Sequence, residues 1–231
     1  MARDRRPRPT ASARDRGLSV ASRPTFTTIL LVRHGTTATT GSVLPGRAPG
    51  LHLSERGLAQ ADQLAQRLKE LSPRPAALYV SPLERARETA APIATALKLR
   101  PVVDRGLLEC DFGTWTGKRL ATLAKRREWR AVQHAPSTFR FPEGESFPEM
   151  QQRMWATLER LAARHRNRTV VVVSHADPIK AAVTFAQGVP LDLFQRTVIS
   201  PCSLSAIAFT SGAPVVLCVN TTGTLKELGP S

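Results

Sequence analysis

A cation, an imidazole and a glycine follow a short apolar run near the start of the chain. Residues 29–32 are all aliphatic, and Arg33-His34-Gly35 comes directly after them. A run of this kind predicts a buried strand, and α/β proteins bind ligands beyond the carboxyl ends of their strands. His34 would then stand where an imidazole can attack a bound ligand. A lone histidine after a strand is more often a surface or core residue, so a catalytic role for His34 needs partners elsewhere.

Two other predicted strands end in residues of the same chemical kind. Residues 77–80 lead into a serine and, one helical turn later, Arg85. Residues 169–173 lead into a serine and then His175. The carboxyl ends of parallel strands meet at one edge of a sheet, so we expect Arg85 and His175 to lie close to the residues that follow the first strand.

These basic residues suit a phosphorylated ligand. Arginine binds phosphoryl oxygens through planar, paired donors, which lysine lacks. Arg33 and Arg85 are therefore predicted to clamp a phosphoryl group, whereas Arg87 is predicted to point elsewhere. Taken singly, Arg85, His175 and Glu109 are each more typical of a surface or core position. Because they fall at separate strand ends that the fold would bring together, we interpret them as one site.

Strands and helices alternate along the body of the chain. Apolar residues at helical spacing predict five helices, at 55–71, 83–97, 118–132, 147–161 and 178–187. Short apolar runs predict strands at 29–32, 77–80, 102–103, 169–173, 204–209 and 215–219. Ser81-Pro82 is predicted to open the second helix, and Pro92 to bend or break it. We expect an α/β fold: a three-layer α/β/α sandwich with an open, mostly parallel sheet in a single domain.

Length and composition suit one soluble domain. The chain has 231 residues, of which 42% are hydrophobic and 22% charged, enough to bury a sizeable core. Its longest aliphatic runs are far short of the roughly 20 residues that span a bilayer. The N-terminal arginines have no apolar stretch behind them, which argues against a secretory signal. Three cysteines without paired or metal-ligand spacing favour a reducing cytoplasm.

Positive charge is unevenly distributed along the chain. Residues 1–24 hold seven arginines and two aspartates, while the whole chain has a formal net charge of +15. Arginine and proline with few apolar residues predict a disordered tail, so we expect the folded domain over 25–222 and a short C-terminal tail over 223–231. The N-terminal tail is most simply a solvated extension; an anchor for nucleic acid or an anionic surface, a transit peptide and an early start codon are alternatives. The excess of cations in the body suits a small anionic substrate such as a phosphate ester.

An ordered set of short motifs runs through nearly the whole body. They are Leu31-Val32-Arg33-His34-Gly35-Thr36, Leu53-Ser54-Glu55-Arg56-Gly57, Ser81-Pro82-Leu83-Glu84-Arg85-Ala86 with Thr89, Glu109 with Gly113-Thr114-Trp115-Thr116-Gly117, Gly144-Glu145-Ser146, and Ser174-His175. In this order they resemble the histidine phosphatase superfamily, the phosphoglycerate mutase-like group, over about residues 28–210. Residues 115–118 and 175–180 look most similar to its small actinobacterial phosphatase or putative phosphomutase branch.

The resemblance implies a role for each residue of the predicted site. His34 would attack phosphorus and form a phosphohistidine, which water then hydrolyses. Glu109 would act as the general acid and afterwards as the base. A further set of groups would hold the phosphoryl oxygens: Arg33, Arg85, His175 and the backbone N–H of Ala176. The flanking cations would lower the pKa of His34 and favour its neutral, attacking form, and neither a metal nor another cofactor is implied.

Some positions depart from the family pattern. Thr39-Thr40 stands where the family usually has tryptophan and asparagine, so a side-chain amide to the phosphate is replaced, at best, by the Thr40 hydroxyl. Gly46 corresponds to a substrate-lining glycine of the family. Thr116 replaces a common glutamate, and Ala176 replaces a glycine while keeping the N–H donor.

The short connection after the tryptophan motif bears on the reaction. Only the 26 residues 118–143 join it to Gly144, whereas the glycolytic mutases of the family carry a longer insertion over the site. We therefore predict a metal-independent phosphomonoesterase, a hydrolase acting on a small phosphorylated metabolite in the cytoplasm. A phosphomutase, which is an isomerase, is the alternative, and a non-catalytic protein that binds phosphorylated ligands or nucleic acid is the third. Substrate choice depends on loops around 41–50 and 125–145, so sugar phosphates, phosphoglycerates and nucleotides stay open, as does the oligomeric state.

Overall fold

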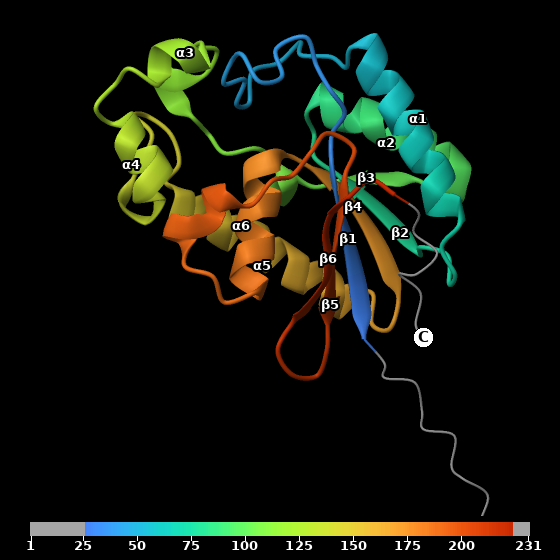
Figure 1. Cartoon of the computed structure of the whole chain (residues 1–231). Coiled ribbons are helices and arrows are strands. Elements are labelled where there is room, and N and C mark those ends of the chain that lie inside the picture. Colours follow the sequence, from blue (N-terminus) through green and yellow to red (C-terminus); the bar gives the residue numbers. More distant parts are fainter. Residues whose placement is uncertain (1–25, 224–231) are drawn as a thin grey trace, which may run out of the picture.

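Six strands form one mixed sheet in the order β3-β2-β4-β1-β5-β6 (Figure 1). The computed structural model describes residues 26–223, so the predicted tail over 1–24 and all but the first residue of the tail over 223–231 lie outside the described residues. The strands are β1 (Thr27–Arg33), β2 (Ala77–Val80), β3 (Pro101–Val103), β4 (Thr169–Ser174), β5 (Leu204–Phe209) and β6 (Val215–Thr221). Strands β1 to β4 are parallel, β5 runs antiparallel to β1, and β6 runs antiparallel to β5. The predicted open, mostly parallel sheet is confirmed, with an antiparallel pair at one edge.

The register of the central strands brings their carboxyl ends level. Val173 of β4 pairs with Val32 of β1 on one side and with Val80 of β2 on the other. The pairing continues one residue further, because the backbone N–H of His34 donates to the carbonyl of Ser174 at 3.0 Å. Residues that follow these three strands therefore leave the sheet at one edge.

Helices cover both faces of the sheet. The longer ones are α1 (Glu55–Lys69), α2 (Glu84–Leu97), α5 (Phe147–Arg164) and α6 (Ala176–Ala186), and the shorter ones are α3 (Leu120–Leu123), α4 (Trp129–His134), η1 (Arg105–Leu107), η2 (Gly113–Trp115), η3 (Pro136–Thr138) and η4 (Leu191–Arg196). Alternate strand residues point to opposite faces: Leu30 and Val32 pack with α1 and α2, and Ile29 and Leu31 with α5 and α6. This is the predicted α/β/α sandwich, with its core in two layers. Within residues 26–223, no helix is long and apolar enough to cross a membrane.

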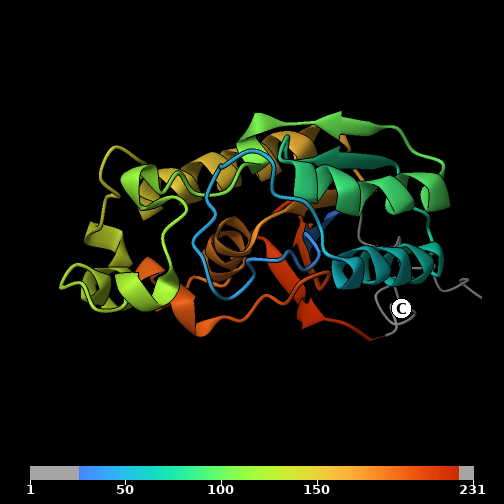
Figure 2. The ribbon, with the colours of Figure 1, turned by 90° about the horizontal axis from the view of Figure 1, so that it is seen from above.

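The segment between the tryptophan motif and α5 differs most from the prediction. Instead of one helix over 118–132, the chain forms the two short helices α3 and α4. Residues 124–128 between them are all exposed, and without an apolar face to bury, a short helix has little to stabilise it. An aromatic cluster anchors the segment to the body: Phe112, Trp115, Trp129, Phe139, Phe141 and Phe147. Both views place α3 and α4 at the opposite end of the molecule from α1 (Figures 1 and 2).

Helix α2 is continuous through Pro92, so of the predicted bend or break only the break is excluded. Buried side chains on either side, among them Ala90 and Ile93, hold the helix against α1 and the sheet. Its N-cap residue is Leu83, which makes no side-chain capping hydrogen bond, so Ser81 does not cap it. On α1, one of the apolar residues whose spacing predicts the helix, Leu58, does not face the core and is 49% exposed.

The start of α1 packs directly on the loop that follows His34. The N-cap residue Ser54 accepts a hydrogen bond from the N–H of Gly57, and its own hydroxyl donates to the carbonyl of Thr36 at 3.0 Å. A Cβ atom added at Gly57 would lie 2.1 Å from that same carbonyl oxygen. Only glycine allows this approach, so the motif at 53–57 fixes the helix against the backbone beside the predicted nucleophile.

We expect Gly57→Ala to lower the free energy of unfolding by about 1–3 kcal/mol, the usual effect of forcing an atom into a packed contact. The loss outweighs the better helix propensity of alanine, and urea unfolding measures it. Gly212→Ala is the control, since its Cβ would meet nothing nearer than 3.8 Å and should change stability by less than about 0.5 kcal/mol. Equal stability of the two variants would contradict the close packing at Gly57.

Candidate active site

Two histidine rings lie side by side at the edge where the central strands end. His34 follows β1 and His175 follows β4, and their ring centroids are 5.1 Å apart. Both side chains are buried. Ser81, the residue after β2, lies behind the second ring, with its Oγ 2.7 Å from the Nε2 of His175. The structure thus brings together the residues that the sequence placed at separate strand ends.

His34 is held as a neutral tautomer with one nitrogen available for attack. Its Nδ1 lies 2.8 Å from the carbonyl oxygen of Gly35, and because a carbonyl only accepts, Nδ1 must carry the proton. On the other side of the ring, the Nε of Arg85 donates to Nε2 at 3.2 Å, so Nε2 presents its lone pair. Burial, and then the charge of Arg85, lower the pKa of His34 to about 3. The imidazole is therefore neutral at physiological pH.

Buried nitrogens without partners surround this ring. Arg85 donates from Nη2 to the carbonyl of Gly46 at 2.8 Å, and Arg33 donates from Nη1 to the carbonyl of Ile199 at 2.6 Å. In the part of the chain that the structure describes, Arg33 Nε, Arg85 Nη1 and His175 Nδ1 are buried without a hydrogen-bond partner. Unsatisfied buried polar groups are costly, and an anion with several acceptor oxygens would satisfy such a set.

Glu109 supplies a carboxyl that holds a proton near neutral pH. Its side chain is buried, and Oε1 accepts a hydrogen bond from the N–H of Cys110 at 2.9 Å. Burial, and then the charge of Asp177, raise the pKa of Glu109 to about 7, although the Cys110 N–H, Arg85 and Arg33 act in the opposite direction. The fold itself therefore raises the pKa of this carboxyl. A carboxyl with this pKa can both donate and accept a proton in catalysis.

Two hydroxyls support the site in ways that sequence reasoning did not identify. The Ser81 hydroxyl forms a hydrogen bond with Nε2 of His175; in the tautomer in which this hydroxyl donates, Nδ1 carries the proton and can donate to an anion. Thr89 accepts from the N–H of Gly35 at 3.0 Å and donates to the carbonyl of Arg85 at 2.7 Å. Thr89 stands one helical turn after Arg85, a spacing that is visible in the sequence and could have indicated this link.

A network of charged side chains behind Glu109 was also missed. The main-chain oxygen of Glu109 accepts from Arg47 at 2.9 Å and from Arg153 at 3.3 Å. Glu145 forms ion pairs with both of these arginines. The motif Gly144-Glu145-Ser146 was the available signal, but sequence reasoning gave it no role.

The remaining predicted residues take different places. The Thr40 hydroxyl accepts from the N–H of Thr37 at 2.9 Å, a contact that holds the turn of its own loop. The carbonyl of Gly46 accepts a hydrogen bond from Arg85, and Ala176 is the first residue of α6. Phosphate contacts from Thr40 and Ala176 stay predictions. Across the described residues, no group of three His, Cys, Asp or Glu side chains is placed to hold a metal ion.

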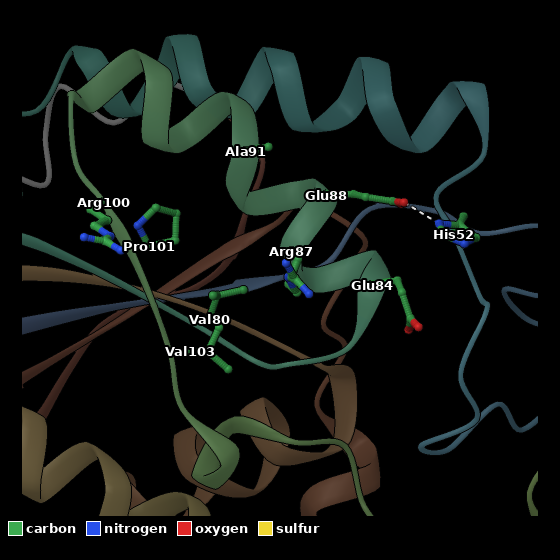
Figure 3. A pocket seen from close by; sticks show the side chains of 9 residues that line it. All are labelled: His52, Val80, Glu84, Arg87, Glu88, Ala91, Arg100, Pro101 and Val103. Atoms are coloured by element: carbon green, nitrogen blue, oxygen red, sulfur yellow. Dashed lines mark hydrogen bonds and ion pairs between the residues drawn. The ribbon is translucent and has the colours of Figure 1, made fainter.

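Arg87 points away from these groups, as predicted. It lines a separate pocket beside α2 and β3, together with Arg100, Val103 and an ion pair between His52 and Glu88 (Figure 3). This pocket is not lined by either histidine of the site. Arg85, the second residue of α2, and the exposed Arg87 thus serve different surfaces.

The sequence matches a family model described as histidine phosphatase superfamily (branch 1) over residues 29–222. Phosphoserine phosphatase 1 of Hydrogenobacter thermophilus is 35% identical over 189 residues, which cover 79% of this chain and 88% of that protein. A probable phosphoglycerate mutase of Erwinia tasmaniensis is 32% identical over 181 residues, 78% of this chain and 83% of that protein. A bifunctional protein of Mycobacterium tuberculosis is 37% identical over 212 residues, 88% of this chain but only 56% of its own length.

The fold leads to the same family. A crystal structure of phosphoserine phosphatase from Entamoeba histolytica in complex with 3-phosphoglyceric acid superposes with a TM-score of 0.76 at 26% identity, covering 85% of this chain and 98% of that one. The mycobacterial relative agrees with the predicted similarity to actinobacterial members. With a family model that spans almost all of the described residues and relatives above 30% identity, the chain belongs to the histidine phosphatase superfamily.

Proposed function

We propose that this protein hydrolyses phosphomonoesters of small metabolites through a phosphohistidine formed on His34, without a metal ion. The observation that carries the proposal is the unprotonated Nε2 of a buried, neutral His34, whose lone pair accepts a hydrogen bond from Arg85, a guanidinium that also has an unpaired donor. Nε2 attacks phosphorus, the bond from phosphorus to the ester oxygen breaks, and the leaving alkoxide takes the proton of Glu109. Water then attacks the phosphohistidine and gives its proton to the Glu109 carboxylate, which releases phosphate and restores the nucleophile.

Positive charge around the nucleophile supports this chemistry. Phosphoryl transfer spreads negative charge over three oxygens, and preorganised donors at those oxygens are the main source of catalysis. Arg33, Arg85 and His175 each have one buried nitrogen without a partner. The backbone N–H of Ala176, at the positive end of the eleven-residue helix α6, would add a fourth donor.

The relatives guide the choice of substrate. The matched proteins named phosphoserine phosphatase make phosphoserine and related phosphorylated acids the first esters to test, with sugar phosphates and nucleotides as comparison. The relative named as a probable phosphoglycerate mutase supports phosphomutase activity as the second candidate. The short α3–α4 segment in place of a longer insertion favours water as the acceptor.

Location and the arginine-rich N-terminal segment are part of the proposal as well. Three free cysteines, Cys110, Cys202 and Cys218, support a cytoplasmic location. The role of residues 1–24 as a solvated extension, or as an anchor for nucleic acid or an anionic surface, stays a prediction, because these residues lie outside the described part of the chain.

We expect His34→Ala to lower kcat/KM for phosphomonoesters by about a thousandfold or more, because it removes a covalent nucleophile. Wild-type protein quenched during turnover should carry acid-labile phosphate, and the variant should carry none. His134→Ala, an exposed histidine at the end of α4, is the control and should behave as wild type. Unchanged turnover in His34→Ala would overturn the mechanism, and isomerisation that requires a bisphosphorylated primer, with negligible phosphate release, would establish the mutase instead.

The dependence of kcat/KM on pH should show an alkaline limb that reports a group of the enzyme and an acid limb that reports the substrate. Activity falls above about pH 7, because the pKa of Glu109 is about 7 and its acid form is the one that protonates the leaving group. The acid limb belongs to the substrate phosphate, whose second pKa is about 6, since the pKa of His34 is about 3. Asp177→Asn should shift the alkaline limb to lower pH, because it removes a negative charge that raises the pKa of Glu109. An alkaline limb that persists unchanged in Glu109→Gln would contradict the assignment.

A further inference from the structure

One guanidinium binds three carbonyls of the loop that carries Glu109. Arg153, in the second turn of α5, donates from Nη1 to the carbonyls of Gly106 and Leu108 at 2.8 and 2.9 Å. Its Nη2 donates to the carbonyl of Glu109 at 3.3 Å. Charged donors make the stronger kind of hydrogen bond, so α5 holds this loop at three points.

Arg47 holds the same carbonyl from the loop on the other side of the site. Its Nε donates to the main-chain oxygen of Glu109 at 2.9 Å. The preceding residue, Gly46, accepts a hydrogen bond from Arg85, the arginine beside the nucleophile. Gly46 therefore contacts the phosphate-binding side of the site, and the next residue, Arg47, contacts the general-acid side. Together they set the distance between the two sides.

Glu145 joins the two arginines. Its Oε1 accepts from the Nε of Arg153 at 2.8 Å, and its Oε2 lies 2.8 Å from the Nη2 of Arg47 and 3.1 Å from the N–H of Asp111. Burial works to raise the pKa of Glu145, but Arg153, the Asp111 N–H and Arg47 outweigh it, and the pKa is lowered. The carboxylate thus stays ionised and lets two cations converge on one carbonyl oxygen.

The carboxyl of Glu109 itself has little to orient it. Among the described residues, its side chain makes one hydrogen bond, with the N–H of the next residue, Cys110. The direction of the carboxyl therefore depends on where its own backbone is held. We infer that Glu145, acting through Arg47 and Arg153, is a positioning residue for the general acid, an inference that rests on the proposed function.

If Glu145 positions the general acid, the effect of its loss on kcat/KM should depend on the leaving group of the substrate. An alkyl phosphate releases a strongly basic alkoxide and needs the proton of Glu109, whereas p-nitrophenyl phosphate releases a stable anion and does not. The ratio kcat/KM reports only the steps up to release of the alcohol, so it isolates this proton transfer from the later hydrolysis of the phosphohistidine. A displaced general acid should slow the alkyl ester selectively, while a general loosening of the site should slow both esters alike.

The test compares kcat/KM for phosphoserine, or the best alkyl ester, with that for p-nitrophenyl phosphate in Glu145→Gln and Arg153→Lys. We expect the alkyl ester to lose about 10- to 100-fold, less than the roughly 100- to 10,000-fold that a general acid contributes, because the acid is displaced and not removed, and the aryl ester to lose less than about threefold. Arg160→Gln is the matched control, since Arg160 lies on the same helix, is itself exposed, and pairs with Asp104 at 2.6 Å, while within the described residues it makes no ion pair or hydrogen bond with Glu145 or Glu109. This variant should leave kcat/KM unchanged for both esters.

Equal losses on both esters, or no loss on either, would overturn the positioning role. Arg47→Lys keeps the inference testable if Glu145→Gln fails to fold, because Arg47 lies on a loop, and it should show the same selectivity. Glu109→Gln distinguishes a failure of the positioning role from a failure of the proposed general acid. If it shows the alkyl-selective loss and the network variants do not, only the positioning role is wrong; if it shows none, the proposed general acid is wrong.

Discussion

The chemistry of the site depends on one hydrogen bond, from the Nε of Arg85 to the Nε2 of His34. A guanidinium can only donate, so the nitrogen that faces it must keep its lone pair. The same contact places a positive charge where phosphoryl oxygens would lie during attack. Arg85 is fully buried, and a buried charge needs compensating hydrogen bonds, which is why the loop carbonyl of Gly46 must reach it. Thr89 also links the segments that carry His34 and Arg85, because it accepts from the N–H of Gly35 and donates to the carbonyl of Arg85.

Burial acts in opposite directions on the two groups that the reaction needs. It lowers the pKa of the imidazole of His34 to about 3 and raises the pKa of the Glu109 carboxyl to about 7, because it disfavours the charged form of each. Near neutral pH the nucleophile is therefore unprotonated and the general acid protonated, at a pH where a phosphate monoester is mostly a dianion. Pairs of groups whose environments separate their pKa values in this way are typical of acid–base catalysis.

Sequence reasoning predicted the layers of the fold and the strand ends that carry the basic residues, because strand and helix periodicity are local patterns. Ser81 shows its limit: a serine before a helix fits a capping position, and only the register of β2 against β4 turns its hydroxyl toward His175. The network around Glu145 depends on contacts between segments far apart in the chain, which no local spacing reveals. The single helix expected over 118–132 is not formed. Local propensity favours a helix there, but tertiary packing gives no support to the exposed residues 124–128.

The central claim is that His34 is a neutral nucleophile with its proton on Nδ1. NMR of protein labelled with ¹⁵N at the histidine rings tests it directly, with the His34→Ala spectrum used to assign the signals. The nitrogen shifts should show a protonated Nδ1 and an unprotonated Nε2 for His34, unchanged between pH 5 and 9, in keeping with a pKa of about 3. Titration of this ring near its ordinary value of about 6.5, or a proton on Nε2, would contradict the account.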